Sequence, residues 1–419
     1  MTDSAQPTVQ TEQAAADLRL TGLWRSQRGR SLGLLAIAVL LLWIVMMSVF
    51  PALPAMSRDL GVGPATLGFV LAASSLLMTL LNVPAGVISD RFGRSRPIVI
   101  GLAVCAIGIA LSAITNVAAL FIVGWVVFGV GRGLFLSPTF TVPADLYGPQ
   151  ERGKAIGVLA SSLGAGSVLG YVGAGLLLIV SSWHTILIID TFVLVAVTVI
   201  TRVGLRESQT ARNEVPLARA AAQTAGWFSD RVVLVSGLVS GLSFAVGVAA
   251  TFLVPFSLSN LHASALVIAA VFVPYEVVAS VGTMIVGSAS DRVGRKPPLL
   301  IALVAVTLTL LALPVVGISV WSLAAVYALI GLTEAPMISL STSIVADAVL
   351  RIDPRRLGSA LGANRLLQGL GPVGGPILGG LLAREAGLSV RYWVLSGALA
   401  LVFCLALFLR EPKPVGGQA

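Results

Sequence analysis

The turn "GVISDRFGRSRP" (Gly86–Pro97) has a second copy in the same chain, "GSASDRVGRKPP" (Gly287–Pro298). The copies start 201 residues apart, and each is a short polar stretch between two long apolar runs. A repeat spaced by about half of the 419 residues predicts that the chain consists of two homologous halves.

The composition places both halves in a membrane. Apolar residues make up 57% of the chain and charged residues 11%, and the mean hydropathy is +0.97. Apolar runs of roughly 18 to 25 residues recur along the chain, and each is long enough to cross a hydrocarbon layer about 30 Å thick. Twelve such runs are predicted to span the membrane: Leu32–Leu53, Leu67–Ile88, Pro97–Ile114, Ala118–Thr139, Lys154–Val180, Thr185–Thr201, Val232–Phe256, Leu266–Gly287, Pro298–Val316, Val320–Thr342, Leu357–Leu382 and Tyr392–Phe408.

The repeat and the apolar runs together predict the fold class and the domains. We expect an all-α membrane protein with twelve transmembrane helices in two pseudo-symmetric six-helix bundles. The predicted domains are a cytoplasmic N-terminal tail (1–31), a first bundle (32–205), a cytoplasmic linker (206–230), a second bundle (231–410) and a cytoplasmic tail (411–419).

Lysine and arginine lie mostly on one side of this topology. With both termini inside, 22 of the 27 basic residues face the cytoplasm, whereas Arg58, Arg384 and Arg391 face the other side. Since basic residues are retained on the cytoplasmic side, we predict a multi-pass protein of the inner cell membrane with both termini in the cytoplasm. The net charge of +9 then reflects this topology and contact with membrane lipids, and no nucleic-acid partner is expected.

The repeated turn also resembles a known family. "GVISDRFGR" (86–94), between the second and third predicted helices, is similar to the loop signature of the major facilitator superfamily, and the likeness covers essentially the full chain. The stretch 53–94 is most similar to the twelve-span drug:proton antiporters of that superfamily. The resemblance implies two bundles that rock about a central transport site.

The resemblance further implies a gate on the cytoplasmic side. Gly93 allows a sharp turn, and Arg91 and Arg94 can pair with nearby carboxylates such as Asp145. In the family this cluster holds the halves together in the outward-open state and releases them in the inward-open state; the alternative is that these are simply solvated loop charges. The implied gate residues are Gly86, Asp90, Arg91, Gly93, Arg94, Asp145, Arg152, Gly287, Asp291, Arg292, Gly294 and Arg295.

Glycines mark two of the predicted helices. The antiporters carry the pattern G-x8-G-x3-GP-x2-GG in the fifth helix, where this chain keeps the spacing but lacks the proline and one glycine, whereas the eleventh helix has the complete pattern. One face of the eleventh helix is expected to form a sliding seam between the halves, or to serve ordinary small-residue packing, and Pro376 is expected to kink it. The predicted packing and kink residues are Gly157, Gly166, Gly170, Gly175, Gly362, Gly371, Gly375, Pro376, Gly379 and Gly380.

Charged residues inside the predicted helices are the candidates for the substrate and proton-coupling site. An ionisable group in the bilayer costs about 2.5–3.5 kcal/mol on insertion scales, so each needs a partner or a purpose. The candidates are Arg132, Glu334, Glu276, Arg365 and Asp190. Glu276 is the stronger proton carrier because no basic residue lies in its own helix, and Asp190 is a weaker candidate. A structural ion pair or a snorkelling side chain is the alternative interpretation.

Arg132 and Glu334 are predicted to face each other across the two halves. The offset of 202 residues that relates Asp145 to Asp347 also relates Arg132 to Glu334. In the superfamily the fourth and tenth helices border the central cavity, so we expect a charge pair, or a substrate and proton site, that is made and broken during transport. One departure from the antiporters is that the arginine of their fourth-helix signature aligns with Trp125.

The leading hypothesis is a secondary active transporter that exports an amphipathic or lipophilic organic compound by alternating access, as multidrug transporters do. The proton gradient is expected to supply the energy without a cofactor or metal, and the protein is expected to act as a monomer. The alternatives are an uptake permease for a sugar, metabolite or organic anion, with Arg132 as a carboxylate clamp, and a lipid or lysolipid transporter. An enzyme is disfavoured because the sequence has no metal-spaced cluster, no G-x-S-x-G elbow and no phosphate-binding loop.

Overall fold

The computed structural model describes residues 26–205, 217–352 and 356–409. Most of the predicted N-terminal tail, part of the predicted linker and the predicted C-terminal tail lie outside these ranges. Twelve spans in the described part are long and apolar enough to cross a membrane, as the sequence predicted. The helices are α2 (Gln27–Asp59), α3 (Pro64–Phe92), α4 (Ser95–Ala113), α5 (Ala118–Leu146), α6 (Pro149–Val180), α7 (Trp183–Gly204), α8 (Leu217–Gly226), α9 (Arg231–Asn260), α10 (Ala265–Val293), α11 (Lys296–Val316), α12 (Val320–Ile352), α13 (Leu357–Gln368), α14 (Leu370–Glu385) and α15 (Leu388–Leu407).

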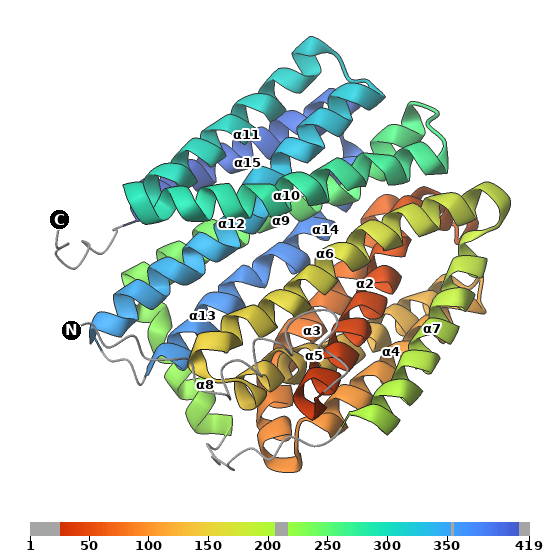
Figure 1. Ribbon diagram of the computed structural model, residues 1–419. Helices are drawn as coiled ribbons and strands as arrows, with labels where there is room; N and C mark the ends of the chain where they lie inside the picture. The colour runs from red at the N-terminus through yellow and green to blue at the C-terminus, as the bar shows by residue number, and fades with distance from the viewer. Residues whose placement is uncertain (1–25, 206–216, 353–355, 410–419) are drawn as a thin grey trace, which may run out of the picture.

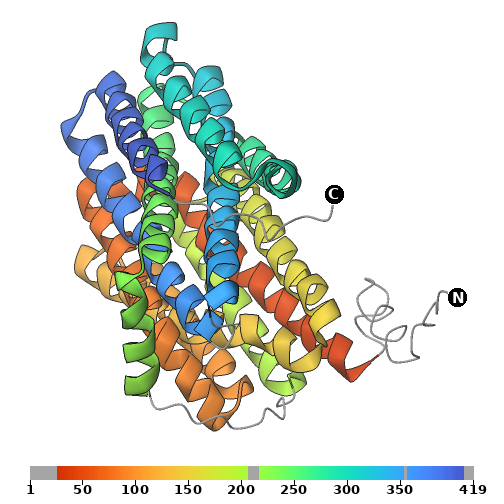
Figure 2. The ribbon, with the colours of Figure 1, turned by 90° about the vertical axis from the view of Figure 1, so that its left-hand side faces the viewer.

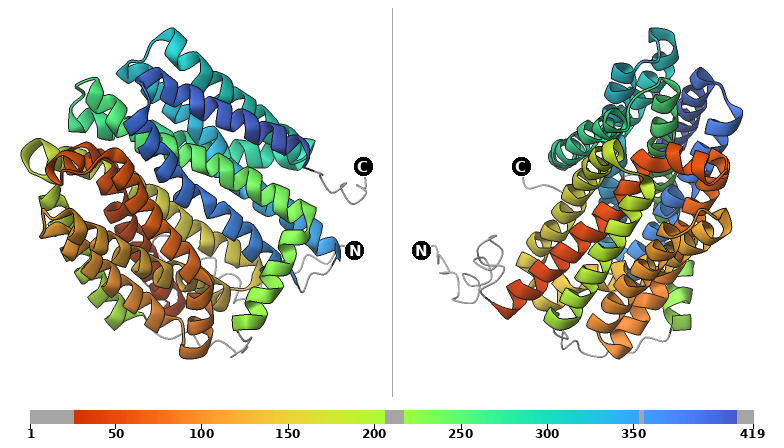
Figure 3. Two further views of the ribbon diagram at one scale, coloured as in Figure 1. Left: turned by 180° about the vertical axis from the view of Figure 1, so that it is seen from behind. Right: turned by 90° about the vertical axis from the view of Figure 1, so that its right-hand side faces the viewer.

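The two halves pack their helices in the same pattern. In the first half α2 packs on α6, α3 on α5 and α4 on α7. In the second half the equivalent pairs are α9 with α14, α10 with α12 and α11 with α15. Figures 2 and 3 show α4 and α7 on the outer side of one half and α11 and α15 on the outer side of the other. The predicted fold of two pseudo-symmetric helical bundles is therefore confirmed.

The halves meet mainly through two pairs of helices, α3 with α14 and α6 with α10, and α2 makes smaller contacts with α9 and α10 (Figure 1). We call the end of the molecule at which α2 begins the terminal face, and the end at which α2 stops and α3 begins the opposite face. Helices α5 and α12, which are equivalent in the repeat, do not pack extensively on each other in the described part of the chain. The contact between the halves is thus carried by helices that flank the seam.

The boundary regions contain more helix than the sequence suggested. Helix α2 begins at Gln27, inside the predicted tail, and the predicted linker holds α8 and a short 3-10 turn, Trp227–Ser229. Helix α8 packs on α13 of the second half and also contacts α3 of the first. The indole of Trp227 donates a hydrogen bond to Ser359 at 2.9 Å. The end of the linker is therefore attached to the terminal face of the second half.

The repeated turn adopts the same structure in both halves. Gly93 and Gly294 cap α3 and α10 with φ of +93° and +91°, a region that residues with a Cβ rarely adopt. After the first turn, Arg94 contacts Asp90 at 2.6 Å and Asp145 on α5 at 3.0 Å. The second turn repeats the arrangement, since its arginine reaches α12 of its own half. That bond joins Arg295 to Asp347 at 3.1 Å.

The ion pairs of these turns lie within one half in the described part of the chain, so they do not join the halves in this conformation. Arg91 differs from its expected role, because it is exposed and its guanidinium lies over the Phe92 ring. Arg152 donates a hydrogen bond to the carbonyl of Ala144 at 3.1 Å. Arg292 is exposed, and the side chain of Asp291 lies outside the described residues. The gate assigned by resemblance therefore stays a prediction about another state.

The eleventh span is divided at Gly369 into α13 and α14, although Gly369 keeps helical backbone angles, and Pro376, the expected kink, lies inside α14. Pro372 lacks an N–H, so the carbonyl of Gln368 loses its usual helical donor, and the proline ring crowds that carbonyl. The chain therefore starts a new helix, α14, immediately after Gly369. A Cβ at Gly369 would touch the side chain of Thr79 on α3, so the break lies against the other half. Pro376 lies inside α14 without ending it.

Arg391 is buried, although the sequence placed it in an outer loop. Its side chain is 6% exposed and donates hydrogen bonds to the carbonyls of Ala386 at 3.1 Å and Ala383 at 3.0 Å. These carbonyls belong to the end of α14, where the last turn of a helix has no backbone donors of its own. Arg391 thus fixes the end of α14 to the start of α15.

We expect Arg391→Ala to lower the temperature of thermal unfolding, because hydrogen bonds from a charged donor contribute about 1.5–3 kcal/mol each. The measurement is unfolding of the detergent-solubilised protein followed by tryptophan fluorescence. Arg384→Ala is the matched control, since Arg384 lies in the last turn of α14 but is 64% exposed. Equal shifts for the two variants would contradict the capping role of Arg391.

Candidate substrate cavity

A cavity of about 360 Å³ lies between the two halves. Helices α2, α3, α5 and α6 line it from the first half, and α9, α10, α12 and α14 line it from the second. Its volume falls in the range of about 300–1,000 Å³ that small-molecule sites occupy. The lining is mainly aliphatic and aromatic, and its aromatic members are Trp43, Phe50, Trp125, Tyr171, Phe244, Tyr275 and Tyr327.

Three of the predicted charged residues reach this cavity: Arg132, Glu276 and Glu334. They are the charged residues among its described lining. Arg132 comes from the first half, and both glutamates come from the second. Arg132 is 4% exposed and Glu334 is 7% exposed, so neither faces lipid. The predicted placement of Arg132 and Glu334 around one chamber agrees with the structure, but the described residues show no ion pair between them.

The position of Arg132 is set by glycines that precede it in its helix. Helix α5 places Gly129 against the backbone of Ser74 on α3, and Gly131 against the backbone of Gly101 on α4. A Cβ at either glycine would collide with that backbone, so these residues let three helices pack closely. Arg132 follows these two glycines, and its Nη2 contacts the thioether sulfur of Met78 on α3 at 3.0 Å. Its guanidinium is therefore fixed by packing.

Glu334 is held by neighbours from its own half. Its carboxylate accepts a hydrogen bond from the hydroxyl of Tyr275 on α10. Gly247 on α9 leaves room for this carboxylate, because a Cβ there would touch it. Tyr275 stacks on Tyr327, with ring centroids 4.6 Å apart, and Tyr327 shares a hydrogen bond of 2.9 Å with Thr251. These contacts form a polar cluster, Thr251–Tyr327–Tyr275–Glu334, in an otherwise apolar wall.

Glu276 follows Tyr275 in sequence and faces the seam between the halves. Its side chain is half-buried and lies close to Ser167 on α6 of the first half, whose hydroxyl donates a hydrogen bond to the carbonyl of Leu163 at 3.2 Å. Ser167 also lines the cavity and is itself buried. Of the two cavity glutamates, Glu276 therefore lies close to a polar group of the other half, whereas Glu334 is bonded within its own half.

Two candidates from the sequence do not line the cavity. Asp190 is 4% exposed, but it lies between α7 and α2, where it accepts a hydrogen bond from Ser48 at 2.7 Å. Arg365 is exposed on α13, whereas its neighbour Asn364 is fully buried. Successive residues of a helix point about 100° apart, so one position decides which side chain turns inward. Asp190 and Arg365 are therefore not placed in a substrate site.

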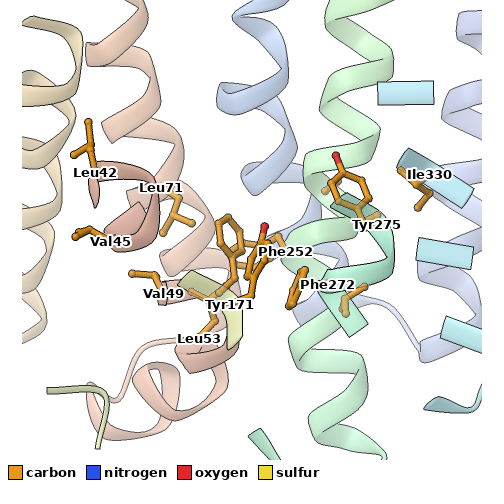
Figure 4. Packing of buried hydrophobic residues seen from close by; sticks show 14 of the residues in the cluster. Leu42, Val45, Val49, Leu53, Leu71, Tyr171, Phe252, Phe272, Tyr275 and Ile330 are labelled. Atoms are coloured by element: carbon orange, nitrogen blue, oxygen red, sulfur yellow. The ribbon is translucent and has the colours of Figure 1, made fainter. Parts of the chain in front are cut away.

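Aromatic side chains fill the seam between the cavity and the opposite face. Tyr171 of α6 stacks on Phe272 of α10, with ring centroids 4.3 Å apart and an interplanar angle of 11°. Figure 4 shows Tyr171 reaching from the first half to the phenylalanines of the second. Phe50 lies against both rings, at centroid distances of 6.2 Å and 6.3 Å. Since Phe50 and Tyr171 belong to one half and Phe272 to the other, this cluster joins the halves by apolar contact.

Small residues close the seam beyond the aromatic cluster. A Cβ at Gly175 would collide with the methyl of Ala269, and a Cβ at Gly68 would collide with the backbone of Pro376. A Cβ at Gly380 would also lie 2.8 Å from the backbone oxygen of Pro64 at the start of α3. Each of these contacts lies within about two turns of a helix end at the opposite face. The two halves are therefore packed backbone to backbone at that face.

The complete glycine pattern does not form this seam in the way the sequence suggested. Gly371, Gly375 and Gly379 pack on Phe244, Val248 and Phe252 of α9, which is in the same half. The contact with the first half comes from the adjoining face, at Pro376 and Gly380. The glycines of the fifth span are divided in the same way. Gly166 and Gly170 pack on α2 of their own half, whereas Gly175 faces the other half. Gly157 and Gly362 make no close contact with a membrane-spanning helix.

Sequence reasoning missed the tyrosines. Three of the five in the chain line the cavity, namely Tyr171, Tyr275 and Tyr327. A tyrosine in the middle of an apolar helix carries a hydroxyl that needs a partner in the membrane, which is the same signal that marked the charged residues. Applied to tyrosine, that rule would have identified the partner of Glu334.

Comparisons with known proteins agree with this architecture. The chain matches the family model described as Major Facilitator Superfamily over residues 35–257 and 233–419. Multidrug resistance protein 3 of Bacillus subtilis is 32% identical over 121 residues, which cover 29% of this chain and 24% of the relative. Multidrug efflux pump LfrA of Mycolicibacterium smegmatis is 29% identical over 171 residues, which cover 41% of this chain and 34% of the relative. The matches thus span about a quarter to a third of these relatives.

Solved structures show the same fold. The nucleoside transporter NupG superposes on 91% of this chain and 99% of its own, with a TM-score of 0.70 and 15% identity. At this identity the likeness extends to the arrangement of the helices and not to the substrate.

Proposed function

This chain belongs to the major facilitator superfamily and is a transporter rather than an enzyme, and we propose that it exports a lipophilic or amphipathic organic compound in exchange for protons. The observation that carries this proposal is the cavity between the halves. Its apolar and aromatic lining suits a substrate with a large apolar surface, and its two carboxyl groups, Glu276 and Glu334, can carry protons. The printed names of the multidrug relatives support the same substrate class.

Alternating access would follow from the way the halves are joined. At the opposite face the halves touch through glycine backbones and aromatic rings. Such contacts hold two surfaces together without bonds that are costly to break in the membrane. We propose that this conformation is closed at the opposite face, and that rocking of the halves parts α6 from α10 and α3 from α14 while the loop turns close the terminal face.

The proton step is assigned to Glu334 and its hydrogen-bonded tyrosine. When the carboxyl is ionised, the Tyr275 hydroxyl donates to it, as in this structure. When the carboxyl is protonated, it loses its charge and the pair can separate more easily in an apolar wall. Protonation and substrate occupancy would thus act on the same wall of the cavity. Glu276 lies close to Ser167 across the seam, so its surroundings would change when the two halves separate.

We further propose that the protein works as a monomer in the inner membrane, with the terminal face in the cytoplasm and the proton gradient as its energy source. The basic residues of the loop turns support this orientation, because positive side chains are retained on the cytoplasmic side. The exposed apolar side chains of the outer helices, such as Phe192 on α7 and Leu401 on α15, would contact lipid.

The proposal is tested in proteoliposomes with an imposed pH gradient. We expect lipophilic organic compounds to move from the side of the terminal face to the side of the opposite face. This movement should stop when a protonophore collapses the pH gradient. The panel includes lipophilic cations, lipophilic anions, a nucleoside and a sugar. Accumulation of the nucleoside or sugar with no effect on lipophilic compounds would favour the alternative of an uptake permease and contradict export of a lipophilic compound.

A further inference from the structure

The charges around the cavity are not matched with one another. Glu334 is bonded to Tyr275, and Glu276 faces Ser167. Arg132 has no carboxylate partner among the described residues, and its Nε has no hydrogen-bond acceptor. Its recorded polar contact is with the sulfur of Met78, which is a weak acceptor. Arg132 is therefore a buried charge without a strong partner, whereas Glu276 is only half-buried.

A buried guanidinium without an anion is costly in the membrane. Insertion of an arginine at mid-bilayer depth costs about 2.5–3.5 kcal/mol, and a buried charge is normally paired or hydrogen-bonded. Arg132 cannot easily turn away, because its helix is clamped by Gly129 against α3 and by Gly131 against α4. Its position beside the cavity leaves one place from which an acceptor can come, the cavity itself.

We infer that the cavity binds an organic anion, with a carboxylate on Arg132 and an aromatic or other apolar body among the rings of the surrounding wall. This inference rests on the proposed function, because it names the class of the transported compound. A guanidinium offers two parallel N–H donors that match the two oxygens of a carboxylate. The rings available to the apolar body include Trp43, Trp125 and Phe244.

A lipophilic cation fits the same cavity less well. To reach Glu334, such a cation would have to displace the Tyr275 hydroxyl. It would also enter a chamber that already holds the positive charge of Arg132. An anion gains a charged partner, and the recorded contacts of the guanidinium are weak ones, to the Met78 sulfur and to the Phe128 ring, whose centroid lies 5.6 Å away.

The test is binding of three ligands that share one ring system: 1-naphthoate, 1-naphthamide and 1-naphthylmethylammonium. Isothermal titration calorimetry on the purified full-length protein is expected to show 1-naphthoate binding about 10- to 100-fold more tightly than the amide, the range of a charge-assisted hydrogen bond. In Arg132→Gln this preference is expected to disappear while 1-naphthamide binding stays unchanged. Arg132→Lys is expected to keep part of the preference, because it keeps the charge but not the two-donor geometry.

Arg365→Gln is the matched control, since Arg365 is exposed and does not line the cavity. It is expected to bind all three ligands as the unmodified protein does. Tightest binding of the ammonium, absence of 1-naphthoate binding to folded protein, or 1-naphthoate binding that is indifferent to Arg132→Gln would each overturn the inference. If Arg132→Gln fails to fold, the test is the preference for 1-naphthoate over 1-naphthamide, compared between the unmodified protein and Arg132→Lys. An equal preference in the two would contradict the inference.

Flux measurements separate this inference from the proposed function. Proton-driven transport of 1-naphthylmethylammonium but not of 1-naphthoate would support the proposed export function and contradict the inference that the cavity binds an organic anion. Tight, Arg132-dependent binding of 1-naphthoate without proton-driven transport of any panel compound would support the anion site and contradict the proposed proton-coupled export.

Discussion

Replacing Glu334 by glutamine is expected to reduce proton-driven transport to the level of protein-free liposomes. Glutamine has nearly the shape of a protonated glutamate, and its carbonyl oxygen can still accept the hydrogen bond from Tyr275, so the wall of the cavity should keep its structure. It cannot lose a proton, however, and a carrier that cannot change charge at this position has no means of coupling to the pH gradient. The measurement is substrate flux in proteoliposomes with and without the gradient.

Exchange of labelled for unlabelled substrate without a gradient should persist in Glu334→Gln, because exchange does not require net proton movement. This result would distinguish a folded carrier that has lost proton coupling from a carrier that no longer folds. Glu385→Gln is the matched control, since Glu385 is 66% exposed at the end of α14. Proton-driven flux of Glu334→Gln at the unmodified rate would show that Glu334 is not the coupling group, and the same experiment on Glu276→Gln would then test the second cavity carboxyl.

Cross-linking Gly175 to Ala269 is expected to abolish transport completely. The two residues face each other across the seam, on α6 of one half and α10 of the other, near the opposite face. Gly175→Cys and Ala269→Cys place two thiols next to each other, and α6 and α10 must move apart at this point to reach the Cβ separation of about 3.8 Å in a disulfide. A covalent link there prevents the halves from parting, so the cavity can no longer open to that face. Flux is measured after mild oxidation and again after reduction, which should restore it.

The control for this experiment is a link inside one half. Gly133→Cys on α5 and Leu81→Cys on α3 place their Cβ atoms about as close, since a Cβ at Gly133 would lie 2.8 Å from that of Leu81. Rocking of rigid halves leaves this distance unchanged, so oxidation should not stop transport. Both pairs are built with Cys404→Ser, because Cys404 is exposed. Full activity of the oxidised Gly175–Ala269 pair would contradict movement at this seam.

Several features of the structure could be read from the sequence because they depend on local rules. The length of an apolar run decides whether it spans a membrane, so the twelve spans were predicted. The repeated turn has a positive φ at positions 93 and 294, which favours glycine, and the sequence has glycine at both. A weaker repeat, in the segments that follow the fourth and tenth predicted helices, paired Asp145 with Asp347, and each bonds to the arginine of the turn in its own half.

The sequence also gave the approximate depth of each charged residue in its helix. Arg132 and Glu334 are both near the level of the cavity, as their equivalence in the repeat suggested. Depth follows from counting residues, because each adds about 1.5 Å along the axis. Family membership was predicted on the same basis, from a loop motif at a fixed place among the spans.

The tertiary structure alone decided which way each side chain points and what it meets. In a chain that is apolar all round, the hydrophobic pattern does not mark the inner face of a helix, so Arg365 and Asp190 could not be separated from Arg132 and Glu276. For the same reason the sequence left open whether Gly371 lies on a seam between the halves or packs within its own half, and the structure places it on α9 of the same half. The rotation of a membrane helix is fixed by small-residue contacts between helices that are distant in sequence, and these exist only once the two halves have packed together.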